Sequence, residues 1–123
     1  MWRLIFIAFL LAHSLIHVAI WATPAASAPD APFDASESWL LGSQRSLAMI
    51  VALAAAGLLA TAGVGLWAHA DWWRVIAVIG LGVSLGLMIL WFNPWFTPIE
   101  IVNASLIVGI TLYAWPSAEA LGA

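Results

Sequence analysis

Cysteine and lysine are absent from this chain of 123 residues, and charged residues of all kinds make up only 7% of it. Without cysteine there can be no disulfide, no thiol redox chemistry and no cysteine-ligated zinc or iron–sulfur cluster. A net charge of −3 with three arginines offers no basic patch, which excludes nucleic acid as a partner. The sequence also lacks a glycine-rich phosphate loop and a Ser-His-Asp set, so it gives no reason to expect an enzyme.

Apolar residues are what the sequence has in abundance, at 65%, against roughly 45–50% in ordinary soluble domains. Tryptophans bracket four long apolar runs, and the clearest pairs are Trp2 and Trp21, Trp73 and Trp91, and Trp95 and Trp115. The members of each pair are about 18 to 20 residues apart, roughly 27 to 30 Å of helix, which matches the ~30 Å hydrocarbon core of a bilayer. Because indole prefers the membrane–water boundary, the pattern predicts a multi-pass membrane protein.

We predict an all-α fold, a bundle of four transmembrane helices with antiparallel neighbours that forms a single membrane domain over residues 1–123. The helices are expected at about 3–22, 39–68, 72–92 and 98–115, with a loop at 23–38 that contains three prolines. The first helix precedes a sequence shaped like a signal-cleavage site. Its apolar run is too long for a signal peptide, so we expect it to be retained.

Local signals set the expected helix ends. Asp71 is a natural N-cap for the third helix, because its side chain can accept from free backbone N–H groups. Asn93 and Pro94 end that helix. The residues from Thr97 to Glu100 have a capping-box pattern with Pro98 in the first turn, so they begin the fourth helix.

The arginines predict an orientation. Arg3 and Arg74 fall on one side of the expected membrane, whereas Arg45 and the acidic loop fall on the other. Cytoplasmic loops carry an excess of Lys and Arg, so we expect both termini in the cytoplasm and the chain in the plasma membrane.

Small residues four apart predict where the helices touch, because helices in lipid associate through close backbone approach. These residues are Ala52, Ala56 and Ala60 on the second helix, Gly82 and Gly86 on the third, and Ser105 and Gly109 on the fourth. We expect a Gly86→Leu substitution to wedge two helices apart.

Polar residues gather toward one side of the predicted membrane. They are His13, His17, Gln44, Arg45, Asn93, Glu100 and Asn103. Ionisable groups at membrane depth cost several kcal/mol unless they are paired, so this polar cluster is the candidate functional site.

The two histidines allow three interpretations. His13 and His17 are four residues apart on one helix face, so they could ligate a metal ion with Glu100 as a third ligand. Either histidine could instead hold haem shared with another subunit, because His69 is at the opposite membrane face. The third interpretation is structural: each histidine hydrogen-bonds to Ser, Asn or a backbone carbonyl across the bundle. The cofactor is therefore unknown, with haem or a metal ion as the candidates.

The stretch from Arg3 to His13, RLIFIAFLLAH, resembles the first helix of the DoxX-like family of small four-helix bacterial membrane proteins. An early arginine, an apolar run and a mid-helix histidine carry the resemblance, together with the helix count and the long first loop. The chain departs from the family pattern at Ser14 and at His17 or Val18. The resemblance implies association with membrane redox or quinone-linked systems, and it brings over no catalytic residue.

The function that the sequence favours is that of a non-catalytic accessory subunit of a membrane complex such as a respiratory or redox complex. Its expected partners are the lipid bilayer and either other membrane proteins or further copies of the chain. Two alternatives stay open: a metal- or haem-binding redox protein that uses His13 and His17, and a small oligomeric transporter or channel.

Overall fold

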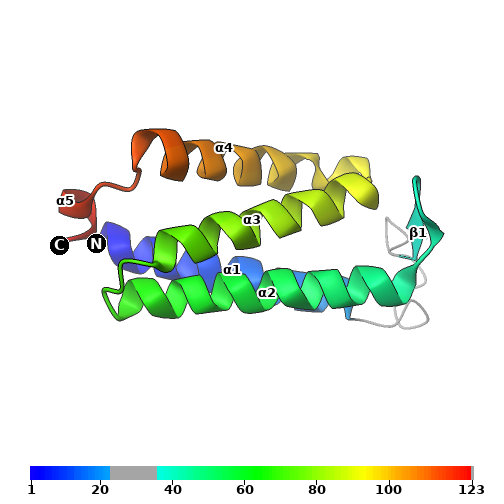
Figure 1. Ribbon diagram of the computed structural model, residues 1–123, viewed down its shortest axis with the longest axis horizontal. Coiled ribbons are helices and arrows are strands. Elements are labelled where there is room, and N and C mark those ends of the chain that lie inside the picture. The colour runs from blue at the N-terminus through cyan, green and yellow to red at the C-terminus, as the bar shows by residue number, and fades with distance from the viewer. Residues whose placement is uncertain (23–35, 123) are drawn as a thin grey trace.

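The computed structural model describes residues 1–22 and 36–122, and these are largely helical (Figure 1). Along the chain the elements are α1 (Trp2–Trp21), β1 (Glu37–Ser38), β2 (Gly42–Ser43), α2 (Arg45–Trp67), α3 (Trp73–Leu90), the 3-10 helix η2 (Pro94–Phe96), α4 (Thr97–Tyr113) and α5 (Ala118–Leu121). Among the described residues, α1, α2, α3 and the segment from Pro94 to Tyr113 are long and apolar enough to cross a membrane. The fold is therefore all-helical with four candidate spans, as predicted.

The helices lie side by side along their lengths, and the two chain ends lie at the same end of the molecule (Figure 1). Helix α2 packs against both α1 and α3, and α4 packs against α3. The first three helices each have 39% of their span buried, whereas the span that contains α4 has only 17% buried. Helix α4 is thus the peripheral member of the bundle.

The core has two apolar clusters with polar side chains between them. One cluster includes Phe6, Leu10, Leu59, Trp73, Leu81 and Ile110. The other includes Trp21, Ala52, Leu87, Met88, Trp91 and Phe96. Along α1, α3 and α4 the buried residues His17, Ser84 and Asn103 fall between the members of the two clusters. The polar layer therefore divides the apolar core.

The second helix, expected from about residue 39, begins at Arg45, and residues 37–43 before it form a β-hairpin. The Ser38 hydroxyl donates to the carbonyl of Leu90 at 2.6 Å, and Trp39 Nε1 donates to the carbonyl of Ile89 at 2.6 Å. The last carbonyls of a helix have no partner within it. The hairpin supplies hydrogen-bond donors to the last carbonyls of α3. This explains why residues 37–43 form a hairpin and are not the first turns of α2. Residues 23–35 of the predicted loop lie outside the described residues.

Two predicted helix caps are wrong. The N-cap of α3 is Trp72 rather than Asp71, and no side chain caps it. At α4 the N-cap is Phe96, so Thr97 is already helical and cannot act as the cap of a capping box. The reason is η2, which begins three residues earlier with Asn93 as its cap: the Asn93 side chain accepts from the backbone N–H of Trp95 at 3.0 Å.

The nine tryptophans divide between the surface and the interior. Six of them are exposed, but Trp21, Trp73 and Trp91 are only 3%, 5% and 2% exposed. Trp21 meets Trp91 edge-on with ring centroids 6.4 Å apart, and it also packs against Phe96 at 5.7 Å. These three residues fill the interior at the helix ends, so their indoles face other side chains of the protein and not its outer surface.

Some of the small residues that were predicted to lie between helices are buried, and others are exposed. Ala52 and Ala56 are buried and Ala60 is half-buried. Ser105 is exposed, and a Cβ added at Gly109 would meet the Trp115 ring at 3.6 Å.

The helix contact predicted at Gly82 and Gly86 is wrong for this chain, because a Cβ added at either position would meet nothing within 4 Å. The close approach is at Gly80, where an added Cβ would lie 3.1 Å from Leu58 Cβ and 3.2 Å from Leu59 Cδ2. Two positions along a helix correspond to roughly 200° of rotation, so Gly80 and Gly82 lie on nearly opposite faces.

Candidate functional site

Three buried side chains from three helices form a continuous hydrogen-bonded chain, which we call the polar chain. It joins His17 of α1 to Ser84 of α3 and Ser84 to Asn103 of α4. His17 Nε2 lies 2.8 Å from Ser84 Oγ, and Asn103 Nδ2 lies 2.7 Å from the same oxygen. All three residues are at most 2% exposed. The polar chain therefore fixes the rotation of α1, α3 and α4 relative to one another.

The direction of each hydrogen bond follows from its chemistry. His17 Nδ1 lies 3.0 Å from the backbone carbonyl oxygen of His13, and a carbonyl can only accept, so Nδ1 carries the proton. In a neutral imidazole Nε2 is then an acceptor, and it receives the proton of the Ser84 hydroxyl. Ser84 Oγ accepts in turn from the Asn103 amide. His17 fits this arrangement as a neutral ring with both nitrogens in use.

The polar chain confirms for His17 the structural interpretation of the histidines, since this residue bonds to a serine and to a backbone carbonyl. A second serine works in the same way: the Ser14 hydroxyl donates to the carbonyl of Ala56 at 2.8 Å and joins α1 to α2. Contacts of this kind hold helices together in apolar surroundings.

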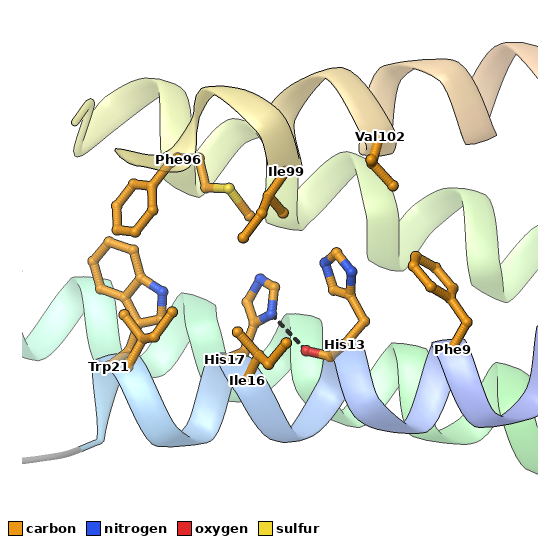
Figure 2. A pocket seen from close by; sticks show the side chains of 10 residues that line it. Phe9, His13, Ile16, His17, Trp21, Phe96, Ile99 and Val102 are labelled. Carbon is orange, nitrogen blue, oxygen red and sulfur yellow. Dashed lines mark hydrogen bonds between the residues drawn. The ribbon is translucent and has the colours of Figure 1, made fainter. Parts of the chain in front are cut away.

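A cavity of about 160 Å³ lies beside the polar chain, between α1 and α4 (Figure 2). Its walls are apolar apart from His13 and His17, and the other lining residues are Phe9, Ile16, Ile20, Trp21, Met88, Phe96, Ile99 and Val102. The His13 ring stacks on His17 with centroids 5.1 Å apart and lies 5.5 Å from Phe9. His13 is 6% exposed, and its Nε2 is buried with no hydrogen-bond partner among the described residues.

The rest of the predicted polar cluster does not join this site. Gln44 is the exposed N-cap of α2, Arg45 is the half-buried first residue of that helix, and Asn93 caps η2. Glu100 is half-buried on α4, and its Oε1 is buried without a hydrogen-bond partner within residues 1–22 and 36–122. Of the predicted residues, only His13, His17 and Asn103 lie in the polar chain or beside the cavity.

The predicted metal site of His13, His17 and Glu100 is wrong. In the part of the chain that the structure describes, no three His, Asp or Glu side chains come together as metal ligands. His17 could ligate a metal or a haem iron only by giving up its bond to Ser84 or to the His13 carbonyl. The arrangement therefore favours hydrogen bonding over coordination at His17.

A second recess, of about 110 Å³, lies at the end of the bundle where the chain begins and ends. Its lining includes Arg3, His69 and Arg74. Arg3 hydrogen-bonds to the ring of His69, and the Arg74 guanidinium donates to the Pro116 carbonyl at 2.8 Å. Two of the three arginines therefore share one end of the molecule.

Sequence reasoning missed Ser84, the residue on which the polar chain depends. Ser84 carries the one hydroxyl in the α3 sequence. A lone hydroxyl in the middle of an apolar helix was the available signal, but a serine costs little in such a helix and has no obligatory partner. The histidines and Asn103 are harder to leave unpaired, and for this reason they were identified.

The fold and the site define a class: a small bundle of apolar helices held by a buried polar chain beside an apolar cavity. Comparisons with known protein families, with curated proteins and with solved structures found no match. The resemblance to the DoxX-like family stays a prediction.

Proposed function

We propose that this chain is a four-span membrane protein with antiparallel neighbours that serves as a non-catalytic accessory subunit of a larger membrane complex. The observation that carries the proposal is the outward face of α3. Spaced four and three residues apart along this face are Val75, Ile79, Gly82, Gly86 and Ile89. All are exposed except the half-buried Gly86, and the two glycines have open space above them.

Two glycines four residues apart on an apolar face suit a second helix better than they suit lipid. Glycine disfavours a helix by about 1 kcal/mol relative to alanine, and it offers lipid no side chain to contact. What it allows is the close approach of another backbone, as in small-xxx-small helix pairs. No described helix of this chain occupies that space, which favours a helix from another membrane protein. The DoxX-like resemblance favours a respiratory or redox complex as the setting.

We also propose that the chain lies in the plasma membrane with both termini in the cytoplasm. Arg3 and Arg74 line a recess at the end that holds the termini, and Arg45 begins α2 at the other end. This distribution agrees with the positive-inside tendency. Because the chain has no cysteine, Ser117→Cys and Leu41→Cys can test it. In intact cells a membrane-impermeant maleimide should label only the second, and labelling of only the first would reverse the orientation.

Co-purification tests the subunit proposal. Tagged full-length chain, extracted from native membranes in a mild detergent, should bring down a defined membrane protein at a fixed ratio. Gly86→Leu should reduce that recovery at least fivefold while the isolated chain stays folded, because the leucine fills open space. Gly57→Leu is the matched control, since a Cβ at Gly57 of α2 also meets nothing within 4 Å.

Three results would contradict the subunit proposal. The wild-type chain could emerge alone and monodisperse, or it could recover only further copies of itself. Gly86→Leu and Gly57→Leu could also lose the partner to the same extent, in which case the α3 face is not the contact.

A further inference from the structure

The cavity between α1 and α4 is about large enough to hold a molecule with a single aromatic ring. An engineered protein cavity of about 150 Å³ with aliphatic and aromatic walls is dry and takes up benzene. The cavity described here has about 160 Å³, and aromatic rings of Phe9, Trp21 and Phe96 are part of its wall. Such rings favour edge-on or offset contacts with another aromatic ring. None of the described residues that line it carries a carboxylate or guanidinium group, so the walls suit an uncharged occupant.

One polar atom in this wall has no hydrogen-bond partner in the part of the chain that the structure describes. His13 is 6% exposed, and its Nε2 is buried without a partner, whereas both nitrogens of the neighbouring His17 are bonded. In Figure 2 the His13 ring points away from α1 into the space below Ile99 and Val102. A buried polar group without a partner is costly, so a ligand that reaches this nitrogen gains a bond that the protein itself does not make.

The cavity opens on the side of the molecule. Ile16 and Val102 are part of its lining, yet they are 44% and 41% exposed, so they form its rim. Helices α1 and α4 are not among the pairs in extensive contact, which leaves the rim between them open. The surface around the rim consists of apolar helices. A ligand would therefore enter from an apolar phase and has to be lipophilic itself.

We propose that this cavity binds an uncharged, single-ring lipophile that bears one hydroxyl group, with the ring among Phe9, Ile99 and Val102 and the hydroxyl on His13 Nε2. A hydroxyl is the suitable group because it can donate to or accept from the imidazole and so fits either tautomer of His13. Phenol is the simplest molecule of this class. Toluene has nearly the same shape and cannot make the hydrogen bond.

The test compares these two probes on the purified full-length chain in lipid nanodiscs with 15N-labelled histidine. The sequence has three histidines, so their ring nitrogens can be assigned individually. Phenol should bind saturably and shift the Nε2 resonance of His13 while that of His69 stays in place. Toluene should bind about 3- to 10-fold more weakly, which corresponds to one hydrogen bond.

Two variants distinguish binding of phenol in the cavity from its general partition into lipid. Val102→Phe should fill the cavity from α4 and weaken phenol binding at least tenfold. Val108→Phe is its matched control, because Val108 lies on the same helix, is 45% exposed and does not line the cavity. His13→Phe should bind phenol no better than toluene.

Phenol uptake that does not saturate, or an unchanged His13 Nε2 resonance at saturation, would overturn the proposal. So would equal binding by Val102→Phe and Val108→Phe. If a variant does not fold, the comparison of phenol with toluene on the wild-type chain still decides. The result is independent of the subunit proposal, which concerns the face of α3 and requires a partner.

Discussion

Ser84 receives a hydrogen bond from Asn103 and makes one to His17, so a single hydroxyl serves side chains from two other helices. In water each of these groups would exchange its partner for solvent at little cost. At a buried site no water is available to replace the lost bond, and the cost of breaking it is correspondingly larger. The small serine side chain is therefore central to how the three helices are held.

Ser84→Ala should lower the free energy of unfolding by about 1–2 kcal/mol, because it leaves His17 Nε2 and the Asn103 amide buried without partners. Circular dichroism during titration of mixed micelles with a denaturing detergent measures this change. Ser105→Ala is the matched control, since Ser105 is exposed on α4. Equal stability of the two variants would show that the polar chain contributes nothing.

At this scale the sequence identified His13, His17 and Asn103 but not their mutual geometry. Residues four apart on a helix share a face, so the stacking of the two histidine rings could be expected. The bonds from His17 and Asn103 to Ser84 could not, because they depend on the rotation of α3 and α4 about their axes. Glu100 was expected near the histidines because it falls toward the same side of the predicted membrane. Among the described residues it does not come together with them as a set of metal ligands.

Gly80 of α3 lies close to α2, and it is the glycine of α3 at which an added side chain has little room. An added Cβ would lie 3.1 Å from Leu58 Cβ and 3.3 Å from Leu59 Cγ. Leu58 Cβ is attached directly to the backbone of α2, so it can move only if the helix moves. The spacing of these two helices is therefore set by the absence of a side chain at Gly80.

Gly80→Leu should destabilise the isolated chain by about 1–3 kcal/mol through overpacking. Gly86→Leu, the same change on the same helix, should alter the stability of the isolated chain by less than about 0.5 kcal/mol, because it meets open space. Denaturing-detergent titration of both variants measures the difference. A larger loss of stability for Gly86→Leu than for Gly80→Leu would contradict this account, because the close contact would then lie on the face of α3 that carries Gly86.

The helices themselves were predictable, but several of their details were not. Apolar runs and prolines gave the approximate bounds of α1, α3 and α4. The start of α2 could be given only approximately, because Trp39, Leu40 and Leu41 continue the apolar pattern, although they belong to a hairpin that binds the end of α3. The spacing of small residues suggested Gly82 and Gly86, yet spacing alone does not tell which face of a helix turns inward.

The bundle as a whole is asymmetric, since α1, α2 and α3 bury more of their spans than the segment of α4 does. Four candidate spans could be counted from the sequence, because each apolar run is long and most are separated by prolines or polar residues. The cavity between α1 and α4 could not be predicted. It results from how α4 sits on α3, and no periodicity in the sequence encodes that placement.

The central claim is that lipid surrounds the outward faces of these helices, and a spin label on Val108→Cys tests it most directly. Val108 is on the outer side of α4, 45% exposed, and the native chain has no other cysteine to label. In a bilayer, the label should collide readily with oxygen, which dissolves in hydrocarbon, and be shielded from a water-soluble nickel chelate. A label on Ser117→Cys, beyond α4, should show the opposite preference. Free access of the nickel chelate to the label at position 108 would contradict the account.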